Sequence, residues 1–121
     1  MSKDIKNHKD LKVWKESIRL VTETYRNVKN FPVEERYCLG EQMRRAAISV
    51  PSNIAEGAGR FSPKEFINFL YIGMGSLTEL ETQFIISENL GYLKDLDEIY
   101  RDILSIKIMI NGLIRQLREK L

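Results

Sequence analysis

Residues 44–57 read RRAAISVPSNIAEG and carry the strongest signal for the fold of this chain. Val50 and Ile54 continue an apolar stripe that begins at Leu39 and has the spacing of one face of a helix. Pro51 falls inside this helix, which we expect from about residue 34 to residue 59, and a proline removes one backbone hydrogen bond. Because the stripe keeps its phase across Pro51, we predict one helix, kinked near the proline. The alternative is a helix that restarts with a cap at Asn53.

The clearest helix start in the chain follows this stretch. Ser62, Pro63 and Glu65 occupy the N-cap, first and third positions that are favoured at the start of a helix. Gly91 is a natural stop for this third helix. Its apolar stripe consists of residues with helical spacing: Phe66, Leu70, Gly73, Leu77, Leu80 and Phe84.

A first and a fourth helix flank this pair. We expect Asp10 to cap the first helix, and Phe31-Pro32 to end it because the residue before a proline avoids the helical region. Its apolar stripe is predicted to be Leu11, Trp14, Ile18, Val21, Tyr25 and Val28. The fourth helix begins near Asp95 or Asp97, and its predicted stripe is Leu96, Ile99, Ile103, Ile106, Ile110, Leu113 and Leu117.

These elements predict an all-α protein, an antiparallel up-down-up-down bundle of four helices. Residues 10–121 form the single domain, behind a flexible basic N-terminal flank of residues 1–9. No apolar run approaches the roughly 20 residues that a membrane-spanning helix needs. The N-terminus is charged, which is not typical of a secretory signal. We therefore expect a cytoplasmic protein with no membrane partner.

The third and fourth helices carry more apolar residues than one core-facing stripe requires. These are Ile67, Tyr71, Ile72, Met74, Ile85 and Ile86 in the third helix, and Leu104, Ile108, Met109 and Ile114 in the fourth. A broad core stripe is one interpretation. A subunit interface is the other, and we favour it because large exposed apolar patches are rare on monomers.

Basic residues are concentrated toward the two ends of the sequence. The net charge is +2, but residues 1–30 hold eight Lys or Arg against four Asp or Glu. Such residues are candidates for contacts with nucleic-acid phosphates, although a solvated helix face has the same composition. The candidates are Lys9, Lys12, Lys15, Arg19 and Arg26, with Arg60 and Lys64 before and in the third helix, and Arg115 and Arg118 near the C-terminus. Aromatic residues are not interleaved with these bases, so sequence-specific stacking on single strands is not expected.

The chain offers no constellation for catalysis. His8 is the single histidine, and we expect it to be a solvent-exposed bystander, so neither a His-based triad nor a histidine–cysteine zinc site can form. Cys38 is the single cysteine, and we expect it to act as a small structural hydrophobe. We predict a protein that is not an enzyme and holds no metal or cofactor.

Several charged residues lie close to small residues in the second and third helices. Small side chains let helix axes approach closely, so charges beside them need partners. We expect structural ion pairing among Arg44, Arg45, Glu56, Glu79 and Glu81, within one subunit or between subunits. Pro51, Asn53 and Gly57 belong to the same motif.

The stretch 44–57, its continuation through Ser62-Pro63-Lys64-Glu65-Phe66, and Glu79-Leu80-Glu81-Thr82-Gln83 resemble the 23S rRNA intervening-sequence proteins. The resemblance covers about residues 8–119. It implies a four-helix bundle that assembles as a ring-like homopentamer and has no catalytic activity. The chain is also similar to accessory proteins of diversity-generating retroelements, a resemblance that implies binding to nucleic acid and to a partner protein.

Two functions follow as expectations. The first is an oligomer that binds nucleic acid, RNA more than DNA, through its basic surfaces, because repetition multiplies the number of phosphates neutralised. The second is a scaffold that docks a partner protein on its helix faces.

Overall fold

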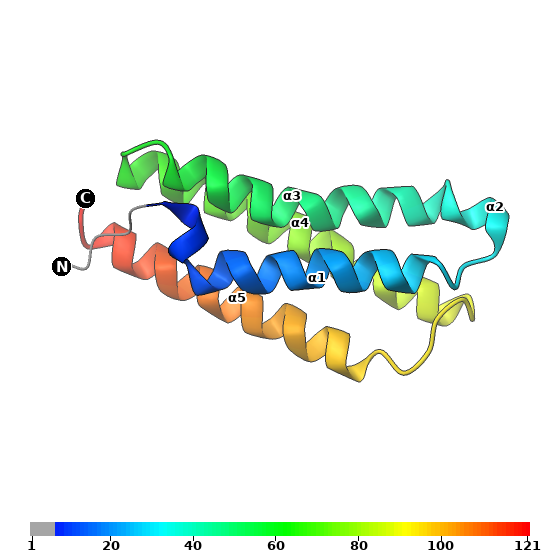
Figure 1. The fold of residues 1–121 in the computed structure, drawn as a ribbon. Helices are drawn as coiled ribbons and strands as arrows, with labels where there is room; N and C mark the ends of the chain where they lie inside the picture. The colour runs from blue at the N-terminus through cyan, green and yellow to red at the C-terminus, as the bar shows by residue number, and fades with distance from the viewer. Residues whose placement is uncertain (1–6) are drawn as a thin grey trace.

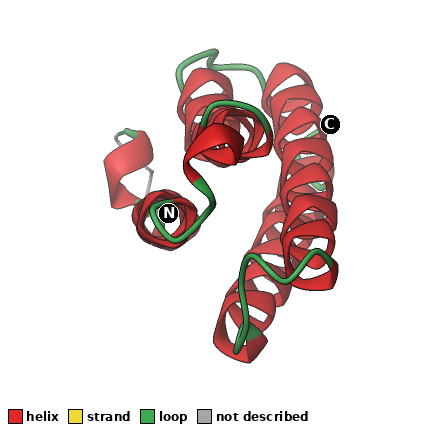
Figure 2. Ribbon diagram, turned by 90° about the vertical axis from the view of Figure 1, so that its right-hand side faces the viewer, coloured by secondary structure: helices red, strands yellow, loops and turns green. Residues whose placement is uncertain are grey.

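Four long helices build the computed structural model, which describes residues 7–121. They are α1 (Lys12–Val28), α3 (Leu39–Ala58), α4 (Pro63–Asn89) and α5 (Asp97–Arg118). A 3-10 helix, η1 (His8–Asp10), precedes α1, and a single helical turn, α2 (Val33–Arg36), precedes α3. The view along the bundle in Figure 2 shows helices joined by loops, with no strand between residues 7 and 121. The predicted all-α, four-helix fold is confirmed.

Consecutive long helices run in opposite directions (Figure 1). Each packs against two others, in the cyclic order α1, α3, α4, α5. The start of α1, the end of α3, the start of α4 and the end of α5 therefore lie at the same end of the bundle. Segments far apart in sequence become neighbours there.

Helix α1 buries its predicted stripe only in part: Leu11 and Val28 are buried, and Trp14 and Val21 are half-buried against the core. Its buried residues after Leu11 are Val13, Ser17, Leu20, Thr24 and Val28, whereas the predicted Ile18 and Tyr25 are exposed. The two buried hydroxyls are satisfied by their own helix, since Ser17 donates to the Trp14 carbonyl and Thr24 to the Leu20 carbonyl, each at 2.8 Å. The predicted cap is also wrong, because Asp10 belongs to η1 and Leu11 occupies the N-cap position.

The second predicted helix is divided near its start. Residues 37 and 38 separate α2 from α3, and Cys38 is exposed, so its predicted role as a packed hydrophobe is wrong. Beyond this break the helix is continuous through the buried Pro51 and does not restart at Asn53. The unbroken phase of the apolar stripe had predicted this continuity.

Helices α3 and α4 form the most extensive contact in the bundle. A Cβ atom on Gly57 would lie 2.8 Å from Phe66 Cδ1, so only a glycine allows this approach. Ser49 and Ser76 share a hydrogen bond of 2.7 Å across the same contact. At the start of α4, Ser62 Oγ accepts from the Glu65 backbone N–H at 3.3 Å, which confirms the predicted cap.

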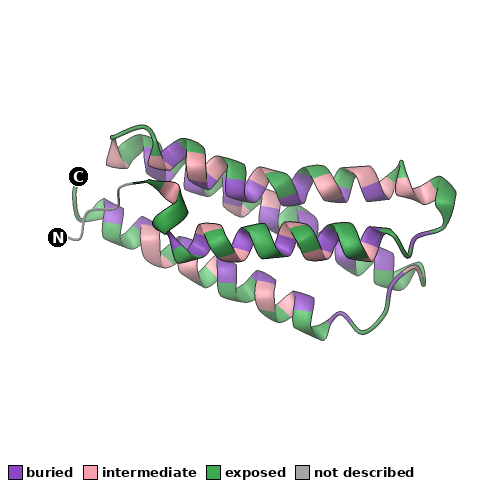
Figure 3. Cartoon of the chain, viewed as in Figure 1, coloured by how far each residue is buried: buried purple, intermediate pink, exposed green. Residues whose placement is uncertain are grey.

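Helix α5 follows its predicted stripe, with every member buried except the half-buried Leu113. Figure 3 shows buried, intermediate and exposed residues alternating along the helices. The surplus apolar residues separate into two groups. Ile67 and Ile114 are buried, and Met74 and Met109 are half-buried. The remainder are exposed on α4 and α5: Tyr71, Ile72, Ile85, Ile86, Leu104 and Ile108. A broad core stripe accounts for the first group but leaves the second uncovered.

Candidate nucleic-acid interface

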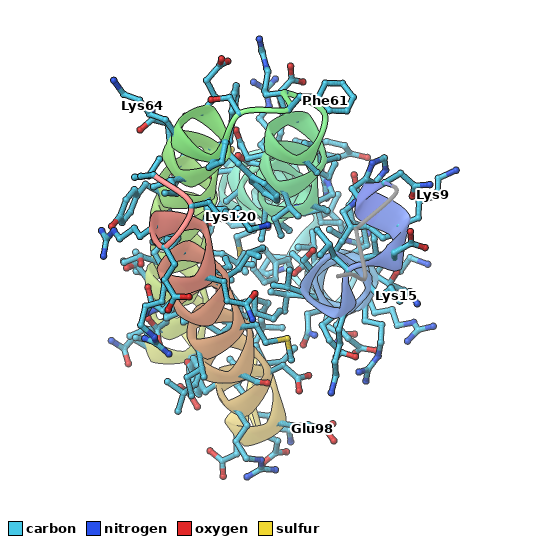
Figure 4. The ribbon with its side chains drawn as sticks, turned by 90° about the vertical axis from the view of Figure 1, so that its left-hand side faces the viewer. Lys9, Lys15, Phe61, Lys64, Glu98 and Lys120 are labelled. Carbon is cyan, nitrogen blue, oxygen red and sulfur yellow. The ribbon has the colours of Figure 1, made fainter. Side chains whose placement is uncertain are left out.

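Four predicted basic residues share one face of α1. Lys12, Lys15, Arg19 and Arg26 are exposed, and their spacing of three, four and seven residues places them on one side of a helix. That side lies away from the buried residues of α1, and Figure 4 shows Lys15 directed outward from the bundle. We call these four residues the basic face of α1.

Half of this face is already paired. Arg19 contacts Glu16 and Arg26 contacts Glu23, each at 2.7 Å. Exposed pairs of this kind contribute only ~0.5 kcal/mol, so a phosphate can displace either carboxylate. Lys12 and Lys15 have no carboxylate partner among residues 7–121, and they are the freest charges of the face.

The other predicted bases gather at one end of the bundle, because the antiparallel topology brings their segments together. We call this the basic end, and it comprises residues 7–16, 56–68 and 111–121. It holds eight Lys or Arg against five Asp or Glu. Figure 4 looks onto it and shows Lys9, Lys15 and Lys64 at its periphery and Lys120 near its centre.

The opposite end has the reverse charge. The acidic end, residues 23–45 and 79–102, holds seven Lys or Arg against eleven Asp or Glu. The pKa of Tyr100 is raised to about 12 in this environment. The causes are partial burial, the hydrogen bond that its hydroxyl donates to Glu88 at 2.9 Å, and the nearby carboxylates. The bundle is therefore polarised along its length, which the small net charge of the chain conceals.

Two bases at the basic end are engaged in the fold. Arg60 contacts Glu56 at 2.9 Å and Glu65 at 3.8 Å, and its guanidinium lies 5.0 Å from the centre of the Phe69 ring. It therefore ties the end of α3 to the start of α4. Arg118 hydrogen-bonds the Tyr71 hydroxyl and lies over its ring, which ties α5 to α4.

Arg115 lies instead at an open groove between α1 and α5. The groove has a volume of about 530 Å³ and an apolar floor that includes Leu11, Met109 and Leu113, with Lys12 and Arg115 among its lining residues. Lys9 and Lys64 are exposed. The structure thus brings most of the predicted bases to one end, and leaves Arg19 and Arg26 farther along α1.

Within one chain, the charged residues of the central motif pair mostly with residues outside the motif. Arg45 contacts Glu41 at 2.9 Å, and Arg44 donates to the Arg36 carbonyl and lies 5.7 Å from the Tyr25 ring centre. Neither arginine reaches the motif carboxylates. Glu81 contacts Lys107 of α5 at 2.7 Å, and Glu56 contacts Arg60. Glu79 is exposed on α4. Asn53 donates to the Ser49 carbonyl and hydroxyl, at 2.8 and 2.9 Å.

His8 has a structural contact, contrary to its prediction as a bystander. Its ring packs edge-on against Trp14, with 5.0 Å between ring centres, and it is half-buried. Both rings line a shallow groove of about 260 Å³ between α1 and α3, with Ile18 and Ile48. This apolar outer face of α1 was missed from the sequence, because its residues were assigned to the core.

Other kinds of site are not evident in the described part of the chain. Within residues 7–121, no group of three or more His, Cys, Asp or Glu is placed to hold a metal ion. None of the helices there has the length and apolar character required to cross a membrane.

A family model for 23S rRNA-intervening sequence proteins matches residues 9–112. The chain belongs to this family. Comparison with curated proteins gives no match. The matched range of the intervening-sequence protein contains the basic face of α1, Arg60 and Lys64, whereas Arg115 and Arg118 lie beyond it.

Proposed function

We propose that this 23S rRNA-intervening sequence protein binds nucleic acid, RNA in preference to DNA, through the basic end and the basic face of α1. One observation carries the proposal: the topology gathers at one end bases that come from three separate segments, while acidic residues accumulate at the other end. Phosphate contacts of this kind give salt-sensitive binding because they release condensed counterions. The family's association with large-subunit rRNA is compatible with an RNA partner.

We further propose that the protein works as a homo-oligomer, with the pentamer that the family resemblance implies. Two apolar surfaces support assembly. One is the groove between α1 and α3, near the exposed Ile18 and Ile48, and the other is the set of exposed apolar residues on α4 and α5. Since these surfaces lie on different helices, copies can join head to tail and close a ring. A ring multiplies the number of basic ends presented to one nucleic acid.

Assembly is tested by sedimentation of charge variants on α1. Ile18→Asp is expected to yield smaller species, because an unpaired carboxylate would be buried at the contact. Thr22→Asp, one turn further along the solvent-exposed side of the same helix, is the matched control and is expected to leave the assembly intact. A monomeric wild-type protein at micromolar concentration would contradict the proposal of an oligomer.

Nucleic-acid binding is tested by titrating labelled RNA with the size-verified protein at several salt concentrations. The variant Lys9→Glu/Lys12→Glu/Lys15→Glu is expected to lose most of the affinity at low salt. It is also expected to show a shallower salt dependence, by roughly 0.7–0.9 in the log–log slope for each phosphate that the variant no longer neutralises.

The matched control reverses three charges at the acidic end, as Lys29→Glu/Lys94→Glu/Arg101→Glu. Both variants change the net charge equally, so an effect of total charge alone would weaken both alike. Binding unchanged in the first variant would contradict the assignment of the basic end. No wild-type binding at ~50 mM salt, where such contacts are strongest, would contradict the function itself.

The proposed function involves no catalytic step, cofactor or metal, and we expect it to take place in the cytoplasm.

The second candidate function is a scaffold that docks a partner protein. The exposed Leu104 and Ile108 of α5 favour it, because they form an apolar surface on a helix that already fills the core with its other face. If Leu104→Asp removed a co-purifying protein while sedimentation and RNA binding were unchanged, the scaffold function would be supported.

A further inference from the structure

Phe61 is the most exposed large apolar side chain in the described part of the molecule. It lies in the loop between α3 and α4, at the basic end, with 98% of its surface exposed. Figure 4 shows its ring projecting from the end of the bundle, away from the core. A phenylalanine in this position contributes no buried apolar area to folding.

The backbone conformation at position 61 is one that phenylalanine rarely adopts. Its φ angle is +58°, in the left-handed region that favours glycine. Two other described residues have positive φ, Gly91 and Asp95, and both are types that tolerate it. A bulky aromatic side chain is an outlier there, and such strain is found most often at functional positions.

The loop itself is held firmly. On one side of Phe61, Arg60 contacts Glu56 and Glu65 and lies over the Phe69 ring. On the other side, Ser62 caps α4. These contacts on both sides restrain the backbone at Phe61. Binding through the ring therefore costs little backbone conformational entropy.

We propose that Phe61 is a stacking platform for an unpaired base of the nucleic acid that the basic end binds. The inference rests on the proposed nucleic-acid function and makes it more specific. An exposed aromatic ring among cations is the arrangement that binds single strands, because every base offers a π-face while Lys and Arg contact the phosphates. Lys64, three residues along the chain, is exposed and has no carboxylate partner among residues 7–121. The favoured ligand is therefore RNA with unpaired nucleotides, such as a hairpin loop, over a continuous duplex.

The decisive variant is Phe61→Gly, because glycine adopts the positive φ without steric strain and the exposed ring contributes no packing to the fold. The probe is a labelled RNA hairpin, compared with a blunt RNA duplex of the same length. Phe61→Gly is expected to weaken hairpin binding roughly tenfold, while the salt dependence of binding and the duplex affinity stay unchanged. Tyr37→Gly is the matched control, since Tyr37 is an exposed aromatic residue at the acidic end and 72% of its surface is accessible.

A second variant, Phe61→Trp, reads the contact directly. Stacking on a base is expected to quench the added tryptophan emission when the hairpin is titrated, relative to wild-type protein, which contains only Trp14. Absence of quenching would overturn the inference. Unchanged hairpin affinity in Phe61→Gly, with salt-sensitive binding retained, would overturn it too, but would leave the proposed function intact. Equal losses for hairpin and duplex would overturn base stacking, and no binding by the wild-type protein would overturn both proposals.

Discussion

Helices α1 and α5 lie side by side in the bundle, yet their sequences relate to the core in opposite ways. In α5 the apolar stripe and the buried face coincide, and Ile103, Ile106 and Ile110 have almost no exposed surface. In α1 the apolar residues Ile18 and Tyr25 are exposed and Trp14 and Val21 are only half-buried against the core, while the hydroxyls of Ser17 and Thr24 are fully buried.

This contrast shows that apolar periodicity identifies a helix but identifies its core face in some helices only, here in α5 and not in α1. Ser17 and Thr24 are small and bond to their own helix, so α1 buries them at little cost. The larger residues then remain available on the outside, next to α3. A helix that buries two hydroxyl-bearing residues and leaves larger apolar side chains exposed is suited to contact a second surface.

The largest expected effect comes from truncating the core face of α5. Ile103→Ala leaves a cavity around a fully buried side chain, and we expect a loss of about 2–5 kcal/mol in the free energy of unfolding. Ile18→Ala, on the outer stripe of α1, is expected to cost less than about 1 kcal/mol in dilute, monomeric protein. Urea denaturation measures both. Equal losses would show that the outer stripe of α1 is packed as a core face.

The same distinction between a packed and an open face applies to two glycines. Gly57→Ala puts a Cβ atom within 2.9 Å of both Phe66 and Phe69, and we expect a loss of about 1–3 kcal/mol from overpacking. Around Gly75, on the exposed side of α4, a Cβ atom would meet nothing within 4 Å. Gly75→Ala is therefore expected to stabilise the monomer by up to about 1 kcal/mol, because alanine favours a helix. Thermal unfolding that ranked the two variants in the opposite order would contradict this packing.

Exchanging core residue types between the two helices has a smaller expected effect in α1. Thr24→Val replaces a buried hydroxyl with a methyl group of similar size, and we expect a change of less than about 1 kcal/mol, in either direction. The opposite change in α5, Ile110→Thr, places a hydroxyl where an apolar side chain packed and is expected to cost about 1–3 kcal/mol. Chemical denaturation distinguishes them. A large loss of stability in Thr24→Val would mean that the Thr24 hydroxyl stabilises the fold by more than its hydrogen bond to the Leu20 carbonyl.

The smallest effect lies at the start of α5. The pKa of Tyr100 is raised from its usual 10.0 to about 12, so the folded protein keeps this proton more tightly than the unfolded chain does. Its contribution to stability is complete below pH 10 and is lost as the pH rises toward 12. Tyr100→Phe is expected to flatten the decline in melting temperature over that window. If the melting temperature of the wild-type protein and of Tyr100→Phe fell equally steeply with pH, Tyr100 would not be the cause of the decline.

The candidate site was partly predictable. Clustered lysines near the N-terminus and the bases at the C-terminus pointed to charged surfaces, but a chain with a net charge of +2 gives no sign that one end is basic and the other acidic. The bases at the basic end come from segments far apart in the sequence, so the bundle topology had to be known first. Phe61 was overlooked, although Arg60 precedes it and Lys64 follows closely.

Short-range signals in the sequence were sufficient to place the long helices and to identify the family. Capping by Ser62, the phase of a stripe through Pro51 and the regular isoleucines of α5 depend on backbone geometry within a few residues. The buried face of α1, the contacts of Arg60 and the gathering of charge at one end came from the tertiary packing alone. Those features depend on which helix surfaces contact each other across the bundle. Periodicity along the chain indicates that a helix face is apolar, but it does not indicate which other segment covers that face.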